Sequence, residues 1–265
     1  MVASAWALYD EMIAGVPEDV LVKDYSLGVA WSYLEAESGM GVAFTARQGG
    51  RRSVMGDLRG KSLREVAALA KSWCFEEATL GVAALNAWYS QPGRLEANGF
   101  QVEYEKLGAE DGDADPRLGM KFDAFEIYRP QIAAQGNAKV VVVGHFPNVT
   151  DIAEYAELTV LERACRDKWD TPDPACEYVV PGADYAFITG VTLINKTAPR
   201  LLELSKNART IMVGPSVVMA PALFARDVEC MAGSVVTDPE ATRFASANGV
   251  GQLFGKSLQM VMARK

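Results

Sequence analysis

The stretch KVVVVG at residues 139–144 decides the fold of this chain. Its four consecutive valines are β-branched and stiff at χ1, which favours extended backbone. The run does not alternate between apolar and polar residues. Such a strand is typical of a parallel sheet whose two faces are both covered. The segment therefore predicts the first strand of an α/β sheet.

Further strands and helices follow this segment along the chain. Strands are predicted at residues 158–161, 185–189, 208–213 and 228–231, with a helix at 198–204 among them. Strands that alternate with helices imply a mostly parallel sheet with right-handed crossovers. We therefore expect a Rossmann-like α/β domain over residues 116–265.

The first half of the chain has a different pattern, helix and strands followed by helices. An amphipathic helix is predicted over residues 1–14, extended structure over 20–34, a turn at Gly39-Met40-Gly41 and a returning strand over 42–47. Helices are predicted from a capping box at Ser62 and Glu65 to residue 73, and over residues 75–90 up to a stop at Pro92-Gly93. This order predicts a smaller α+β domain over residues 1–115, whose end falls in the acidic, glycine-rich stretch at 108–116.

Composition excludes several classes of protein. The 265 residues carry a net charge of −8, and the one basic group, Arg47 with Arg51 and Arg52, is predicted to be a solvated loop. A nucleic-acid partner is therefore not expected. The four cysteines form no C-x-x-C pair, which predicts reduced thiols in a cytoplasmic protein. Neither a leader nor a membrane span is expected.

Three predicted strands end in polar loops that contain glycine. These loops are GHFPN (144–148), TGVTLINKT (189–197) and GPS (214–216). Open α/β sheets bind ligands outside the carboxyl ends of their strands, where glycine allows close approach of the backbone. We expect His145, Asn195 and Ser216 to meet at one rim that faces the first domain. His145, the one histidine of the chain, is predicted either to be structural or to act as a proton carrier or one metal ligand.

The predicted helix over residues 75–90 holds three polar side chains of interest. Asn86 lies among apolar residues, so its amide is expected to face the cleft or to bridge the two domains. Glu76 and Glu77 are predicted to be exposed carboxylates favoured by the helix dipole. Lys196 is the lysine nearest the predicted pocket, which makes it the candidate for a Schiff base.

The segments KVVVVGHFPNV, DYAFITGVTLINKT and TIMVGPSVVMAPALF resemble the putative heavy-metal chelation domain family, and LGVAALNAWYS resembles the first domain of its members. The resemblance covers most of the chain. It implies an enolase-N-terminal-like domain in front of a Rossmann-like domain, a site between them, and a transition metal as cofactor. The residues that match the family's loops are Gly144, His145, Asn148, Thr189, Gly190, Thr192, Asn195, Gly214, Pro215 and Ser216.

Three functions remain open from the sequence. The first is a protein that handles a metal or metallocofactor, in which His145 and nearby oxygen ligands hold a transition metal in the interdomain cleft and a bound ligand supplies part of its coordination. The second is a transferase-like enzyme or binding module that takes a nucleotide or another small anionic molecule without a protein-bound metal. The third is an assembly partner with a vestigial pocket. The expected partners are a small molecule or a metal, together with further copies of the chain in a homo-oligomer.

Overall fold

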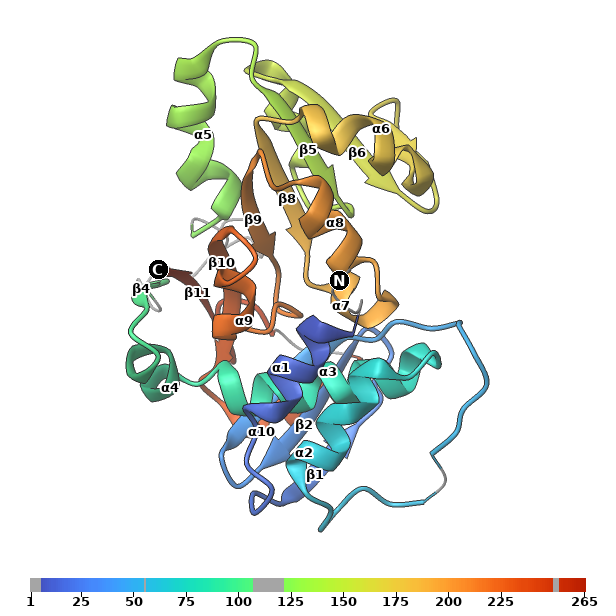
Figure 1. Cartoon of the computed structure of the whole chain (residues 1–265). Helices are drawn as coiled ribbons and strands as arrows, with labels where there is room; N and C mark the ends of the chain where they lie inside the picture. Colours follow the sequence, from blue (N-terminus) through green and yellow to red (C-terminus); the bar gives the residue numbers. More distant parts are fainter. Residues whose placement is uncertain (1–5, 55, 107–121, 250–252) are drawn as a thin grey trace.

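The computed structural model describes residues 6–54, 56–106, 122–249 and 253–265, and it contains two β-sheets. Figure 1 shows the larger sheet above the smaller one, with helices packed on both. The larger sheet has the strand order β4-β11-β10-β9-β8-β5-β6-β7, and the smaller one the order β1-β2-β3. The fold is therefore α/β, with a large, mostly parallel sheet and a small antiparallel one, as predicted.

Six strands of the large sheet are parallel and arranged in the Rossmann order. These strands are β5 (Lys139–Val143), β6 (Glu157–Glu162), β7 (Asp170–Pro172), β8 (Tyr185–Thr189), β9 (Arg209–Val213) and β10 (Val228–Val236). Counted from β5, their spatial order is 3-2-1-4-5-6, which is the doubly wound arrangement. The order reverses between β5 and β8, so a ligand crevice is expected at the carboxyl ends of these two strands.

Both faces of β5 are buried, which explains its run of valines. Val141 and Val143 belong to a core shared with the small domain. Val140 and Val142 belong to a second core on the opposite face, which includes Tyr128 of α5. Because successive side chains of a strand point to opposite faces, a strand covered on both sides needs apolar residues at every position.

The remaining elements cover these sheets. The small sheet consists of β1 (Val22–Ser26), β2 (Trp31–Ala36) and β3 (Gly39–Phe44). The helices are α1 (Ala7–Ala14), α2 (Leu63–Ala67), α3 (Phe75–Tyr89), α4 (Pro92–Ala97), α5 (Ala124–Gln135), α6 (Cys176–Val179), α7 (Val191–Asn195), α8 (Ala198–Leu204), α9 (Pro221–Phe224) and α10 (Pro239–Asn248), with 3-10 turns η1 (Ala68–Lys71), η3 (Val149–Glu154), η4 (Asp173–Ala175) and η5 (Val180–Gly182). Within the described residues, no helix is long and apolar enough to cross a membrane.

The hairpin of the small sheet differs from the prediction. The extended segment over residues 20–34 is divided between β1 and β2, and the β2–β3 turn comes before Gly39. Gly41 lies inside β3, where a Cβ atom would be 2.2 Å from the amide nitrogen of Ala87 in α3. The glycine therefore permits close packing of helix on strand and does not form the turn.

Two sequence features that were predicted to begin or end a helix act differently in the structure. The Ser62 hydroxyl makes no hydrogen bond within the described residues, and Glu65 pairs with Lys61, so the capping box does not form. Pro92 stands in the first turn of α4, where proline is well tolerated, so it begins a new helix shortly after α3 ends.

Glu77 is a further correction, because it is 3% exposed and not a surface carboxylate. Its two oxygens accept hydrogen bonds from the amides of Ser53 and Val54 and from the hydroxyls of Ser53 and Ser72. The sequence pattern did not reveal this, because the residues that donate the amide hydrogen bonds lie in a loop far upstream of the helix. The interaction fixes that loop to α3.

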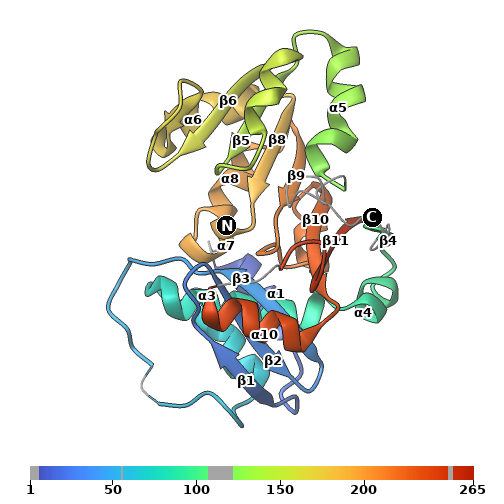
Figure 2. The same cartoon turned by 180° about the vertical axis from the view of Figure 1, so that it is seen from behind.

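Segments are exchanged between the two predicted domains. The predicted boundary at residue 115 lies outside the described residues. β4 (Gln101–Tyr104) pairs with β11 (Leu258–Arg264) at the edge of the large sheet, although it precedes that boundary. In return, α10 lies against the small sheet (Figure 2), where Arg243 ion-pairs with Glu35 of β2 at 2.7 Å. The two units are therefore linked by chain crossing in both directions.

Candidate functional site

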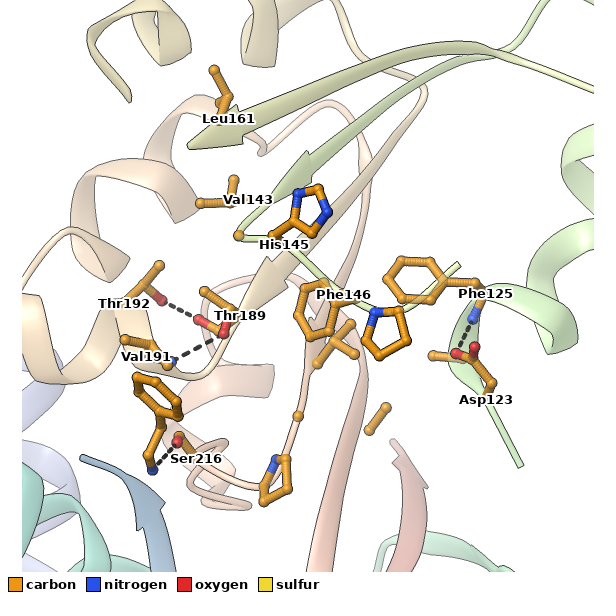
Figure 3. Close-up of a pocket in the computed structure, with 18 of the residues that line it drawn as sticks. Asp123, Phe125, Val143, His145, Phe146, Leu161, Thr189, Val191, Thr192 and Ser216 are labelled. Carbon is orange, nitrogen blue, oxygen red and sulfur yellow. Dashed lines mark hydrogen bonds between the residues drawn. The ribbon is translucent and has the colours of Figure 1, made fainter. Parts of the chain in front are cut away.

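A cavity of about 740 Å³ lies at the carboxyl ends of β5, β8 and β9, where the strand order of the large sheet reverses. Trp31 and Phe44 of the small domain also line it. Figure 3 shows the residues after β5 and β8 surrounding this space, with Ser216 at the side of the small sheet. The volume lies in the range of small-molecule sites.

Most of the predicted site residues meet in this cavity. His145, Asn195 and Ser216, which lie far apart in the sequence, are all in its wall. The predicted residues that line it are Gly144, His145, Thr189, Thr192, Asn195, Gly214, Pro215 and Ser216. The structure thus brings the three strand-end loops together, while their role in binding a ligand stays a prediction.

Asn148, Gly190 and Asn86 do not line the cavity. Asn148 is exposed and takes a left-handed conformation at the start of η3. Gly190 packs directly on the backbone of the loop after β9, since a Cβ atom there would be 2.3 Å from the amide nitrogen of Val217. These two predicted site residues therefore lie outside the cavity wall.

Asn86 and Ser216 hold the two domains together. Asn86 is 1% exposed, and its amide group donates to Val42 O at 2.9 Å and to Pro215 O at 3.2 Å. The Ser216 hydroxyl accepts from the amide of Phe44 at 2.8 Å. Of the two roles expected for Asn86, the structure assigns the bridge between domains. The hydroxyl of Ser216 is likewise engaged in the interface.

The loop after β8 is stabilised by its own side chains. The Thr192 hydroxyl donates to Thr189 O at 2.6 Å, and the amide of Val191 donates to the Thr189 hydroxyl at 3.3 Å. The Asn195 side-chain oxygen accepts from the amide and the hydroxyl of Thr197. These short-range bonds fix the backbone around the cavity before a ligand arrives.

His145 has a buried carboxylate behind it. The imidazole is 47% exposed, and its Nδ1 lies 3.6 Å from Oδ1 of Asp170, whose side chain is 1% exposed. The other Asp170 oxygen accepts from the amides of Arg166 and Asp167, and these hydrogen bonds help to hold the pKa of Asp170 below its usual value. Sequence reasoning missed Asp170 because it begins a strand of three residues, too short to give a periodic signal.

Lys196 lies where the cavity meets the small domain. It has a left-handed conformation, and Nζ donates to Ile194 O at 2.7 Å and to Ser72 O. The rings of Trp73 and Phe75 lie 5.8 and 5.6 Å from Nζ. Burial lowers the pKa of Lys196 to about 8. Among the described residues it has no carboxylate partner, unlike Arg163 and Arg200 in the same cavity wall.

Much of the cavity wall is aromatic and aliphatic. Phe125 and Phe146 meet edge to face, with centroids 5.4 Å apart, and Trp31 packs in the same way on Phe44 and Phe254. Figure 3 shows Asp123 beside Phe125, whose amide donates to its carboxylate. Burial raises the pKa of Asp123 to about 6 and also raises the pKa of Glu105.

A metal site built from protein ligands alone does not fit these residues. Within the described parts of the chain, no group of three histidine, cysteine, aspartate or glutamate side chains is arranged to hold an ion. Cys74 and Cys230 are buried and Cys165 is exposed, while Cys176 alone of the four lines the cavity. Among the described residues, His145 is therefore not part of a set of three protein donors such as a structural or catalytic transition-metal site uses.

Two family models match the chain, one over residues 127–263 and one over residues 9–89, and both are described as putative heavy-metal chelation. The chain is 33% identical over 219 residues to an uncharacterized protein of Methanocaldococcus jannaschii, and the match covers 78% of this chain and 75% of that protein.

Two solved structures have the same fold. The crystal structure of a DUF364 family protein of unknown function from Desulfitobacterium hafniense has a TM-score of 0.83 and 32% identity, and the match covers 98% of this chain and 99% of that one. A second, from Pyrococcus horikoshii, has a TM-score of 0.75 at 22% identity with the same coverage and supports the fold alone. The chain belongs to the DUF364 family, which is described as putative heavy-metal chelation.

Proposed function

We propose that the chain binds a small organic chelate in the interdomain cavity. The molecule would supply most of the donors to a metal ion, and His145 would supply one from the protein. The observation that carries this proposal is a largely apolar cavity that holds one imidazole and, among the described residues, no protein set of three metal donors. The family description agrees with metal handling.

The chemistry of the wall favours such a ligand over a bare ion. Phe125, Phe146 and Trp31 offer ring faces and edges to a flat organic molecule. A bare transition ion would lose its hydration shell in this largely apolar space, and the described residues offer no set of three protein donors to replace it. An ion that arrives inside a chelator keeps its donors, and an imidazole suits nickel, cobalt or zinc as an additional ligand.

The test compares an ion with its chelate on protein prepared without a histidine tag. Isothermal calorimetry would measure Ni²⁺ alone, 1,10-phenanthroline alone and their one-to-one complex. We expect the complex to bind at least tenfold more tightly than either component, and His145→Ala to weaken only the complex, by about 10–100-fold. Equal affinity for free Ni²⁺, or an unchanged complex affinity in His145→Ala, would contradict the proposal. Cys165→Ser, at an exposed thiol, is the matched control.

A second candidate rests on Lys196. A partly buried lysine without a carboxylate partner among the described residues, whose pKa is lowered to about 8, has the properties of an amine that condenses with a carbonyl compound. Arg163 and Arg200 line the same cavity and would attract an anionic group on that compound. This function corresponds to a transferase-like enzyme or binding module without a protein-bound metal.

Reductive trapping tests the second candidate. The Lys196 amine and the aldehyde of pyridoxal phosphate would form an imine and release water, and cyanoborohydride would then deliver a hydride to the imine carbon. Peptide mass spectrometry is expected to place the adduct on Lys196, and Lys196→Arg to remove it. Lys71→Arg is the control, because Lys71 is paired with Asp10. Labelling spread equally over surface lysines would refute this candidate.

A further inference from the structure

One oxygen of the Asp170 carboxylate, Oδ1, has no hydrogen-bond donor among the described residues. Within the described residues, Oδ1 is buried and accepts no hydrogen bond, although the side chain is 1% exposed. A buried carboxylate oxygen without a donor is costly, so a donor is expected beside it. The His145 ring lies beside it, with Nδ1 3.6 Å from Oδ1, slightly farther than a formed hydrogen bond.

The carboxylate is held in place by its own turn. Oδ2 accepts from the amide of Arg166 at 2.6 Å and from that of Asp167 at 2.8 Å, and the Asp170 amide donates back to Asp167 O. The pairing of the strands places this carboxylate near His145. Asp170 is opposite Val160 of β6, and the next residue of β6, Leu161, accepts a hydrogen bond from the amide of Gly144, which precedes His145. Oδ1 is therefore an acceptor held in a fixed position beside the imidazole.

We infer that Asp170 is a positioning residue that keeps the proton of neutral His145 on Nδ1 and so leaves the lone pair of Nε2 available to the cavity. A histidine nitrogen with a carboxylate on its other side is the arrangement that orients an imidazole for metal binding or proton acceptance. The cavity thus offers its ligand an electron-pair donor. The ligand that fits carries a group that accepts this electron pair. That group is either a metal ion with an open coordination position or an acidic proton. This deepens the proposed function, but the tautomer itself is a property of the free protein.

The chain's single histidine makes the inference directly measurable. In untagged protein labelled with ¹⁵N, long-range proton–nitrogen correlation reports which ring nitrogen of His145 carries the proton in the neutral form. We expect the proton on Nδ1. A proton on Nε2 in the wild-type protein would overturn the inference without any variant.

Two matched variants extend the measurement. In Asp170→Asn, the side-chain oxygen can still accept from Arg166 and Asp167, while its amide group would donate to Nδ1. The proton of His145 is then expected to move to Nε2, and affinity for the nickel–phenanthroline complex to fall by about tenfold or more. Asp151→Asn is the control, because Asp151 is an exposed aspartate that does not line the cavity.

The outcomes separate this inference from the proposed function. If the tautomer in Asp170→Asn stays as in the wild type, the positioning role of Asp170 is refuted. If the tautomer moves as expected but the nickel complex binds neither protein, the chelate proposal fails and the role of Asp170 stands. The backbone correlation spectrum of each variant checks that the fold is retained.

Discussion

Replacing Gly190 with alanine is expected to lower the free energy of unfolding by about 3 kcal/mol, the upper end of typical overpacking costs. A Cβ atom at this position would lie 2.3 Å from the amide nitrogen of Val217 and 2.4 Å from the carbonyl carbon of Ser216. Both are backbone atoms, so no side-chain rotation relieves the overlap. Urea denaturation followed by circular dichroism measures the loss.

The loop that Gly190 touches cannot shift without further cost. Ser216 is hydrogen-bonded to Phe44, and Pro215 to Asn86, so movement of this loop would break contacts between the two domains. Gly93→Ala is the matched control, because a Cβ atom at that position of α4 would have no neighbour within 4 Å. It is expected to be neutral or to stabilise the protein by up to about 1 kcal/mol. Equal stability of the two variants would show that Gly190 is not a packing position.

Replacing Glu77 with alanine is expected to cost about 2–4 kcal/mol of unfolding free energy, since hydrogen bonds to charged groups contribute more than neutral ones. The carboxylate accepts from two amides and two hydroxyls, and its loss frees residues 53 and 54 from α3. Chemical denaturation measures the effect. Glu76→Ala is the control, because among the described residues that carboxylate accepts a single bond, from the Cys74 thiol.

The same contacts predict a pH dependence. Although burial opposes ionisation, the hydrogen bonds from Ser72, Val54 and Ser53 together lower the pKa of Glu77 below its ordinary value of 4.5. The unfolded chain therefore binds this proton at a higher pH than the folded chain does. The stabilisation is fully present above about pH 4.5 and is lost as the pH falls through the folded value. The difference in stability between wild type and Glu77→Ala should shrink below this range, and a difference independent of pH would contradict the assignment.

The local pattern of apolar residues was sufficient to predict the strands and helices whose burial is regular along the chain. The valines of β5, the strand β8, the helix α8 and the apolar face of α3 were all predictable, because periodicity and β-branching reflect burial directly. The meeting of the three strand-end loops was also predictable, since the carboxyl ends of parallel strands lie on one edge of a sheet.

Contacts between distant segments were not predictable in this way. β4 joins the large sheet by pairing with β11, and α10 packs on the small sheet. No short motif specifies which segment pairs at a sheet edge or covers the other unit. Glu77 and Asp170 appeared in the sequence as ordinary charged residues. The partner of Glu77 is an upstream loop, and that of Asp170 is the histidine that follows β5, two strands away in the sheet; both come close only after the chain has folded.

The sequence by itself thus determined the α/β class, the doubly wound half and the edge at which a cavity forms, because repeated apolar burial leaves a periodic trace along the chain. Tertiary structure alone decided which polar groups at that edge remain available to a ligand. Asn86 and Ser216 join the two domains and Gly190 packs on the loop after β9, while His145 lines the cavity with Asp170 beside it. The physical reason is that a polar side chain satisfies its hydrogen bonds with whichever partner folding brings near, and that partner is not encoded in its neighbours along the sequence.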